Sequence, residues 1–364
     1  MNREPSPEGG RAGRLLIFKP DGIGDFILST GAIRVMADAV GEARLTLVVR
    51  DLLVPLARAQ FPAACVVGLP IAEKRRVLNL FVLNLYRSLG PIREVRRTRF
   101  DAAVSFRHMR SYMQSLTFFS VRAARYFASE NLLARNRRFG RSVVERLIQT
   151  GRAPVEVPYP DVLRGQPTEM EAHRRIVSAV LNREVSFEEI LPVLKAEPGS
   201  NAYRLCAPIS TMEAKDYPFA QWVEAFRLTD AGRRLPLVLT GSLAQRPRLE
   251  ELARSLKDAG MADVEVRLPG DLPAFVDLVA GAAAVFTVDT AAAHIAAALD
   301  RPLLVLFSGL QSGMFAPWQH SERQCWLEAL PKTRERRGRW CDRLPPSMVA
   351  EAIGRTLSFL PGHV

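Results

Sequence analysis

The chain has 364 residues, of which 48% are hydrophobic, and its 50 Lys and Arg against 38 Asp and Glu give it a net charge of +12. A chain of this length usually folds as two domains. It has no apolar run of about 18 residues that could cross a membrane, and residues 1–14 hold charges and prolines where a signal peptide would be apolar. We therefore expect a soluble protein of the cytoplasm.

Apolar runs alternate with helix-length amphipathic segments along the chain. The first part predicts strands at 14–18, 43–49, 65–69 and 101–106, with helices over 24–39 and from Leu53. After the stretch AEPGSNA at 196–202, strands are predicted at 203–208, 235–242, 264–270, 284–289 and 301–308, with helices over 219–230, 245–259 and 346–360. Such alternation is typical of parallel sheets with crossover helices. The sequence therefore predicts an α/β protein of two doubly wound domains with a boundary near residue 198.

The positive charge is concentrated in residues 73–152, which hold 18 basic and five acidic side chains, a net charge of +13. This concentration indicates an anionic partner, either nucleic acid, an anionic membrane surface or a phosphorylated substrate, and a solvated arginine-rich face is the alternative. No zinc spacing, RNP-like aromatic sequence or recognition helix accompanies the arginines, so nucleic acid is not expected. Segment 77–89 is either an amphipathic helix on a membrane surface or a core-facing helix.

The four cysteines do not form a metal-binding pattern. Cys65, Cys206, Cys325 and Cys341 are too far apart for a CxxC pair, so we expect reduced thiols. A site built from Cys325 and Cys341 is the alternative.

The turn after the first strand, KPDGIGDF at 19–26, combines two glycines with two aspartates. In open parallel sheets ligands bind where strands end, so each strand-to-helix turn is a candidate site. Gly22 and Gly24 match the start of a dinucleotide fingerprint, but the third glycine is missing, and Asp25 would repel an anion. A carboxylate there suits a general base that deprotonates a hydroxyl. The alternative for Asp25 is a stabilising acid at a helix N-terminus.

A second turn, PISTMEAKDYP at 208–218, follows the first strand of the second domain. Ser210 and Thr211 carry hydroxyls that can donate to phosphate oxygens, and Lys215 supplies a positive charge for the same group. The pattern indicates a phosphate loop, although such residues also occur on ordinary surface loops.

A third turn, VFTVDTAAAHIAAAL at 285–299, runs from a strand into a helix of small residues. Thr290 is a good N-cap, and the exposed amides of a helix N-terminus favour a diphosphate. Asp289 could hold sugar hydroxyls, and His294 lies about one turn into the helix. A capped, buried helix with an incidental histidine is the alternative.

Together, the three turns resemble glycosyltransferase family 9, the ADP-heptose:lipopolysaccharide heptosyltransferases. KPDGIGDFILSTGAIR at 19–34 resembles the first turn of the family, and residues 208–218 resemble its phosphate loop. Residues 289–299 resemble its most specific motif, in which an acid or amide, a hydroxyl residue and a glycine precede a histidine and Ala-Ala-Ala-Leu. LTGS at 239–242 and the stretch 268–289 also resemble the corresponding segments of the family in residue type, so the resemblance spans roughly residues 14–310.

The resemblance implies a GT-B fold, in which two Rossmann-like domains face each other across a cleft. The implied organisation is a flexible N-terminus at 1–13, an acceptor-binding domain at 14–198, a nucleotide-sugar-binding domain at 199–344, and a C-terminal helix at 345–364 that returns toward the first domain. The implied reaction is an inverting transfer of a heptose or related sugar from a nucleotide-sugar such as ADP-heptose, without a metal or other cofactor.

The resemblance also implies roles for individual residues. Asp25 would be the general base. The donor phosphates would be held by Ser210, Thr211, Lys215, Thr290 and Ala291, the donor sugar by Asp289 and His294, the nucleotide by Gly241 and Ser242, and the acceptor by Arg107, Arg110 and Arg138. The acceptor would be the lipopolysaccharide core or another phosphorylated glycolipid or polysaccharide, and peripheral attachment to the inner face of the cytoplasmic membrane is a further expectation.

Two residues depart from the family pattern. Ala291 replaces the glycine of the third motif, and Gly31 replaces the usual proline of the first. Neither change removes a catalytic group, but both indicate a divergent branch whose donor and acceptor can differ. A nucleotide-sugar epimerase or hydrolase and a catalytically inactive nucleotide-sugar-binding protein are the alternatives. A dehydrogenase is not expected, because Arg50 stands where an acid should follow the second strand.

Overall fold

The computed structural model describes residues 13–70, 90–91, 93, 95–106, 118, 120–129, 155–160, 168–197, 199–229, 235–309, 312–318, 320–329 and 340–360. Contacts divide the chain into two compact units. The first comprises Met1–Gly22, Ser29–Asp161 and Glu169–Leu191, and the second comprises Ile23–Leu28, Val162–Thr168 and Pro192–Val364. Arg107, Arg110, Arg138 and the segment 77–89 lie outside the described residues.

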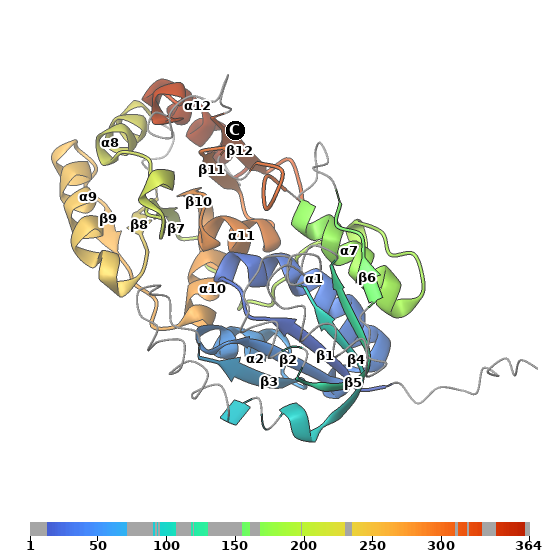
Figure 1. Cartoon of the computed structure of the whole chain (residues 1–364). Coiled ribbons are helices and arrows are strands. Elements are labelled where there is room, and N and C mark those ends of the chain that lie inside the picture. Colours follow the sequence, from blue (N-terminus) through green and yellow to red (C-terminus); the bar gives the residue numbers. More distant parts are fainter. Residues whose placement is uncertain are drawn as a thin grey trace, which may run out of the picture. The chain divides into compact units, whose positions relative to one another are not determined.

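The first unit is built on a parallel sheet whose described strands have the order β3-β2-β1-β4-β5-β6 (Figure 1). The strands are β1 (Leu15–Lys19), β2 (Leu45–Arg50), β3 (Cys65–Leu69), β4 (Arg99–Ser105), β5 (Arg122–Ser129) and β6 (Val155–Val157). Every residue of β1 is buried, as expected for a central strand that is covered on both faces. The described α-helices of this unit are α1 (Ile23–Val40), whose first residues, Ile23–Leu28, group with the second unit, α2 (Val54–Gln60) and α7 (Thr168–Leu181). Short 3₁₀ turns lie at Glu42–Arg44, Asp51–Leu53 and Glu188–Ile190.

The second unit repeats the same topology. Its described strands have the order β12-β11-β10-β7-β8-β9, and all pairs are parallel. The strands are β7 (Tyr203–Ala207), β8 (Leu237–Leu239), β9 (Val264–Val266), β10 (Ala282–Val288), β11 (Leu303–Phe307) and β12 (Gln324–Glu328). Counted within each unit, both orders read 3-2-1-4-5-6, the order of dinucleotide-binding sheets. In each sheet, successive strands are therefore added first toward one edge and then toward the other. This switch in strand order lies between β1 and β4 in the first sheet and between β7 and β10 in the second.

The helices of the second unit pack against its sheet, and buried aromatic side chains form part of the core between them. The described helices are α8 (Phe219–Leu228), α9 (Arg246–Asp258), α10 (Leu272–Ala280), α11 (Ala291–Ala298) and α12 (Pro346–Leu357), with 3₁₀ turns η4 (Glu213–Lys215), η6 (Leu243–Gln245) and η7 (Trp340–Arg343). Trp222 is fully buried and stacks on Phe226, which contacts Phe286 edge-on. Helices α8 and α12 lie side by side (Figure 1). The last helix groups with the second unit by its contacts, and its return toward the first domain, which the family resemblance implies, stays a prediction.

The strand and helix pattern expected from the sequence is confirmed for the central elements, and the edge strands β6 and β12 were missed. Strand β12, QCWLE, has one buried residue followed by four half-buried ones. This strand at the sheet edge includes the polar residues Gln324 and Glu328, so it gives no continuous apolar run. Strand β5 was also missed, because it begins with the basic sequence RAAR.

Gly31 lies in the middle of α1 beneath the backbone of residues 190–191. A Cβ atom at this position would stand 2.2 Å from the carbonyl oxygen of Leu191 and 2.3 Å from that of Ile190. The close approach requires a residue without a side chain. The departure from the usual proline therefore has a packing reason within the first unit.

Candidate active site

The second sheet brings two of the predicted turns together at its switch in strand order, between β7 and β10. Strands β7 and β10 are neighbours, and Ala207 pairs with Thr287 near their carboxyl ends. The loop 208–218 follows β7, and Asp289 and Thr290 follow β10. Ligands of open parallel sheets bind outside the carboxyl ends of the strands at such a switch. The topology thus makes this edge the first candidate for a ligand site.

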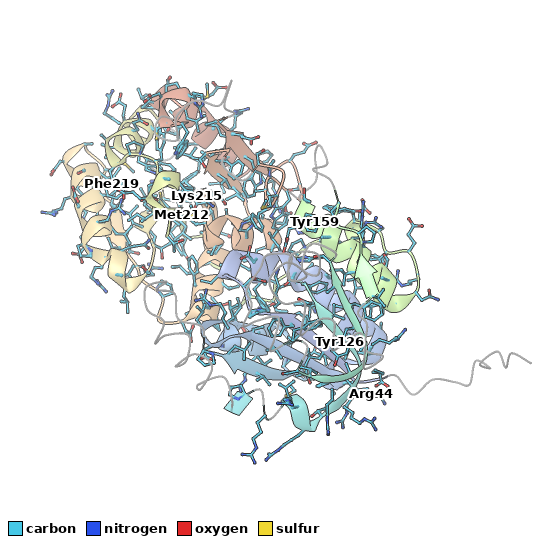
Figure 2. The ribbon with its side chains drawn as sticks, viewed as in Figure 1. Arg44, Tyr126, Tyr159, Met212, Lys215 and Phe219 are labelled. Carbon is cyan, nitrogen blue, oxygen red and sulfur yellow. The ribbon has the colours of Figure 1, made fainter. Side chains whose placement is uncertain are left out.

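The loop after β7 is held in shape by its own polar groups. The backbone N–H of Ser210 donates to Oδ1 of Asp216 at 2.6 Å, and the hydroxyl of Ser210 accepts from the N–H of Met212 at 3.1 Å. Arg248 of α9 holds the other carboxylate oxygen of Asp216 at 3.1 Å. Thr211 is exposed at the tip of the loop. The loop therefore has a defined shape that presents hydroxyls next to η4, near Met212 and Lys215 in Figure 2.

Lys215 and Asp289 join the two loops. The ammonium Nζ of Lys215 donates to Oδ2 of Asp289 at 2.7 Å. The residues are only 9% and 7% exposed, so the pair lies at the inner side of the candidate site. The structure thus brings together two residues that the sequence placed in separate motifs, a cation expected to bind phosphate and a carboxylate expected to bind sugar.

The helix N-terminus predicted after β10 is present. Thr290 is the N-cap of α11, and its hydroxyl accepts from the N–H of Ala292 at 3.2 Å. The hydroxyl of Thr287 lies 3.1 Å from that of Thr290 and donates to the carbonyl of Ala207 in the neighbouring strand at 2.8 Å. Ala291 begins the helix and is half-buried. The N-terminal amides of α11 and their partial positive charge therefore lie at the same sheet edge as Lys215.

His294 is buried within α11 and is 5% exposed. Its Nδ1 accepts a hydrogen bond of 3.1 Å from the indole Nε1 of Trp318, and the planes of the two rings are nearly parallel, 8° apart. Burial lowers the pKa of His294, the carboxylates of Asp289 and Asp25 raise it, and Lys215 lowers it, with a net shift below the ordinary value. The imidazole is therefore neutral near pH 7. The sequence motifs gave no signal for Trp318.

The loop after β8 has a capping role. Ser242 and Gln245 form a capping box, in which the backbone N–H of Ser242 donates to Oε1 of Gln245 at 2.8 Å. The Gln245 amide also contacts the carbonyl of Ser210 at 3.5 Å, which links this loop to the phosphate loop. A Cβ atom on Gly241 would lie 2.6 Å from Oε1 of Gln245. The nucleotide-binding role of Gly241 and Ser242 stays a prediction.

Asp25 lies in the first turn of α1. Its segment, Ile23–Leu28, groups with the second unit by its contacts, and its charge contributes to raising the pKa of His294. A Cβ atom on Gly24 would lie 2.8 Å from Cδ2 of His294, so the glycine permits this close approach. The arrangement brings the predicted base and the third motif into one neighbourhood.

A buried ionic cluster at the end of β1 was not predicted. Lys19 is 1% exposed, and its Nζ lies 2.9 Å from Oε1 of Glu169, 3.3 Å from Oδ2 of Asp21 and 3.4 Å from the carbonyl of Phe106. His173 lies 3.3 Å from the same oxygen of Glu169. Asp21 of the first turn thus takes part in an ion pair with Lys19. A lysine that ends a buried strand was the available signal, because a buried cation needs a partner.

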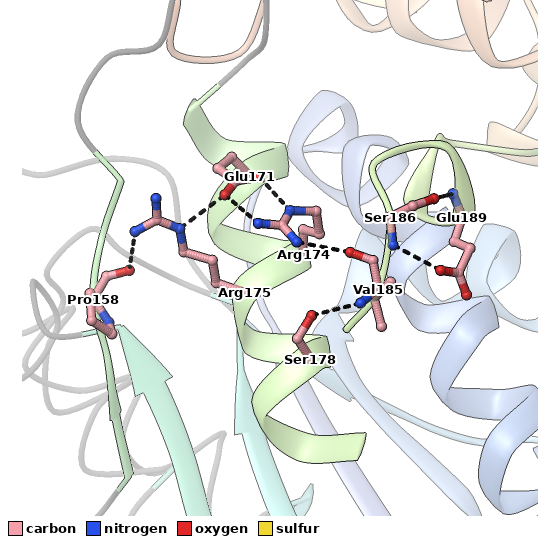
Figure 3. A network of polar contacts seen from close by, with 8 residues as sticks. All are labelled: Pro158, Glu171, Arg174, Arg175, Ser178, Val185, Ser186 and Glu189. Carbon is pink, nitrogen blue, oxygen red and sulfur yellow. Dashed lines mark hydrogen bonds and ion pairs between the residues drawn. The ribbon is translucent and has the colours of Figure 1, made fainter. Parts of the chain in front are cut away.

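Arginines and a glutamate of α7 form a second network in the first unit (Figure 3). Nε of Arg174 and Nε of Arg175 both donate to the carboxylate of Glu171, at 2.6 Å and 2.9 Å respectively. Arg175 also donates to the carbonyl of Pro158. An adjacent cavity of about 540 Å³ is lined by Val155, Val157, Pro158, Arg174, Arg175, Ser178, Ala179, Asn182, Arg183 and Glu184. It lies toward the C-terminal end of α7, where the helix dipole disfavours an anion, and Glu171 offsets the arginine charge. We therefore assign no part of the phosphate site to it.

The described residues contain neither a metal-binding cluster nor a membrane-spanning helix. Within them, no group of three or more His, Cys, Asp or Glu side chains is arranged to hold a metal ion. No helix in the same set is sufficiently long and apolar to span a bilayer.

Sequence comparisons place these features among known proteins. Residues 122–340 match the model of glycosyltransferase family 9 (heptosyltransferase). The chain is 36% identical over 130 residues to lipopolysaccharide heptosyltransferase 1 of Pseudomonas aeruginosa and 31% identical over 139 residues to the Escherichia coli K12 protein of the same name. These alignments cover 35% and 38% of this chain and 34% and 41% of the two relatives, so the matched segments span well under two thirds of their lengths.

Structural comparisons extend over nearly the whole chain. The E. coli heptosyltransferase WaaC with ADP aligns with a TM-score of 0.67 and 19% identity, covering 93% of this chain and 98% of that one. A family 9 glycosyltransferase from Veillonella parvula aligns with a TM-score of 0.70 and 13% identity, covering 97% and 99%. At these identities the similarity establishes the fold, and it confirms the expected GT-B class. Because the family model matches more than half of its residues, the chain belongs to glycosyltransferase family 9, the heptosyltransferase family.

Proposed function

We propose that the protein is an inverting glycosyltransferase that transfers a heptose from ADP-heptose to a lipopolysaccharide-core acceptor without a metal ion. The observation that carries the proposal is the buried Lys215–Asp289 pair, which joins two family motifs at the switch in strand order of the second sheet. Family membership supports the reaction class. The curated relatives are named lipopolysaccharide heptosyltransferases, and one solved neighbour contains ADP.

The second domain, residues 199–344, would bind the donor. Lys215, the N-terminal amides of α11 at Ala291 and the hydroxyls of Ser210, Thr211 and Thr290 would surround the diphosphate, with Asp289 and His294 on the sugar and the loop at Gly241 and Ser242 near the nucleotide. As the bond from the anomeric carbon to the diphosphate breaks, negative charge develops on the leaving group. Fixed N–H dipoles and a buried ammonium stabilise such charge strongly, because they need no reorganisation.

Asp25 would act as the general base. It would take the proton of an acceptor hydroxyl while the oxygen attacks the anomeric carbon from the side opposite the diphosphate, which inverts the configuration. ADP leaves with the electron pair of the broken bond. The acceptor domain, residues 14–198, carries most of the positive charge of the chain, which suits a phosphorylated acceptor or an anionic membrane surface. Arg107, Arg110 and Arg138 remain the proposed acceptor contacts.

The test measures nucleotide release from a panel of nucleotide-sugars that includes ADP-heptose, with and without deacylated lipopolysaccharide core. We expect acceptor-dependent release of ADP, and we expect Asp25→Asn to lower it by about 100- to 10,000-fold, the usual contribution of a general base. Asp38→Asn is the matched control, because Asp38 is exposed on the same helix and lies near its other end. EDTA should leave the rate unchanged.

Different outcomes point to the alternatives. Release that survives Asp25→Asn would remove Asp25 from the role of base. Release or epimerisation without acceptor would favour an epimerase or hydrolase. Nucleotide binding without any turnover would favour a binding protein. A rate that EDTA abolishes and added metal restores would contradict the metal-independent mechanism.

A further inference from the structure

The ring of His294 is fixed by a residue that lies outside the three motifs. Trp318 is 4% exposed and donates its indole N–H to Nδ1 of His294 at 3.1 Å. The ring planes differ by 8°, and their centroids are 6.3 Å apart. An indole nitrogen can only donate a hydrogen bond. Nδ1 of His294 must therefore present its lone pair to Trp318, and it cannot carry a proton.

This contact determines where the imidazole proton lies. A neutral imidazole has one N–H, so an unprotonated Nδ1 leaves the proton on Nε2. Burial lowers the pKa of His294 and favours the neutral ring, even though the charges of Asp289 and Asp25 act in the opposite direction. A Cβ atom on Gly24 would lie 3.4 Å from Nε2 and 2.8 Å from Cδ2, so the edge that carries the N–H points toward the glycine turn before Asp25.

We propose that Trp318 is a positioning residue that holds His294 as the neutral Nε2–H tautomer and so makes His294 a hydrogen-bond donor to an oxygen of the nucleotide-sugar. His294 then has no free lone pair with which to act as a base, which leaves proton removal to a carboxylate. This inference rests on the proposed function for the identity of the ligand. Among the described residues, the charged groups that act electrostatically on the ring are Asp289, Asp25 and Lys215.

The chain offers a matched pair of variants. Trp318→Phe keeps an aromatic ring but removes the indole N–H. Trp326→Phe makes the same change on another ring beside His294. The centroids of the Trp326 and His294 rings are 6.1 Å apart, and their planes are tilted by 49°. The buried indole N–H of Trp326 has no hydrogen-bond partner among the described residues. Loss of the bond to Nδ1 removes a contact that stabilises only the neutral ring, so the pKa of His294 should rise in Trp318→Phe. Trp326→Phe should leave that pKa unchanged.

The experiment uses the full chain with ¹⁵N-labelled histidine, and NMR reads the tautomer and pKa of His294 without any substrate. His294→Gln serves to assign the signal. We expect the Nε2–H tautomer at pH 7 in the wild type, and a pKa about one unit higher with a mixed tautomer in Trp318→Phe. ADP-heptose should shift the Nε2–H signal, and kcat/KM should fall about tenfold in Trp318→Phe, with partial recovery at higher pH.

The proposal would be overturned by an Nδ1–H tautomer in the wild type or by equal effects of Trp318→Phe and Trp326→Phe. A substrate that turns over without shifting the Nε2–H signal would also overturn it. His294→Gln keeps an N–H near the position of Nε2, whereas His294→Asn does not, so similar activity in these two variants would also contradict it. If the tautomer and pKa behave as expected but no nucleotide-sugar binds or reacts, the failure belongs to the proposed function.

Discussion

Each unit buries a lysine against a carboxylate, and the two pairs differ in their surroundings. Lys19 and Glu169 are 2.9 Å apart with side chains 1% exposed, and Lys19 also reaches Asp21 and a backbone carbonyl. Lys215 and Asp289 are 2.7 Å apart with side chains 10% and 7% exposed, beside the N-terminus of α11. A buried lysine–carboxylate pair thus occurs once in an enclosed cluster and once at the edge of a candidate site. We interpret the first as structural and the second as functional.

The largest expected effect comes from the closed pair. Lys19→Met would leave Glu169 and Asp21 without their shared cation in a buried environment, and we expect it to lower the free energy of unfolding by about 3–5 kcal/mol. Urea unfolding measures this loss. The double variant Lys19→Met with Glu169→Gln removes both charges of the pair and should recover much of it.

An exposed pair is the control for this measurement. Arg183 and Glu189 lie 2.7 Å apart with side chains 48% and 39% exposed. Surface pairs contribute little because solvent screens them, so Arg183→Gln should leave the free energy of unfolding nearly unchanged. If Lys19→Met costs no more than Arg183→Gln, the distinction between the closed and the surface pair does not hold.

The functional pair should respond in activity. Lys215→Met removes the ammonium proposed to stabilise the leaving diphosphate, and we expect kcat/KM to fall about 100- to 1,000-fold, or about 2.7–4 kcal/mol. Lys215→Met should lower the free energy of unfolding by less than Lys19→Met does. Lys257→Met, an exposed change near the end of α9, is the control. Unchanged kcat/KM in Lys215→Met would place this pair with the structural one.

The smallest effect is expected at the helix cap. Thr290→Val keeps the shape of the side chain but removes the hydroxyl that accepts from Ala292, and it should cost about 1 kcal/mol in unfolding. The KM for the donor should rise, because the hydroxyl is also proposed to contact phosphate. Thr290→Ser retains the cap and is the control. A loss of stability with an unchanged KM would limit Thr290 to capping.

The sequence predicted the central elements of both sheets, because buried parallel strands are continuous apolar runs and their turns contain glycine, aspartate and threonine. It also pointed to Lys215, Asp289 and His294, because each lies in a local motif. It did not reveal the partners of Lys19 or His294. Glu169 is 150 residues from Lys19, and Trp318 is 24 residues from His294. No local periodicity relates such residues, so their pairing emerges only when the chain packs.

Gly31 has a consequence for engineering. Stabilising libraries often replace unusual residues with the commonest residue of a family, and the family resemblance would put proline at position 31. Here the backbone of residues 190–191 occupies the space that any side chain would need. Residue 31 and the segment 190–191 therefore have to change together. In a homologue with proline at this position, we expect that segment to lie farther from the helix. Transplanting the proline without the segment should reduce the yield of folded protein.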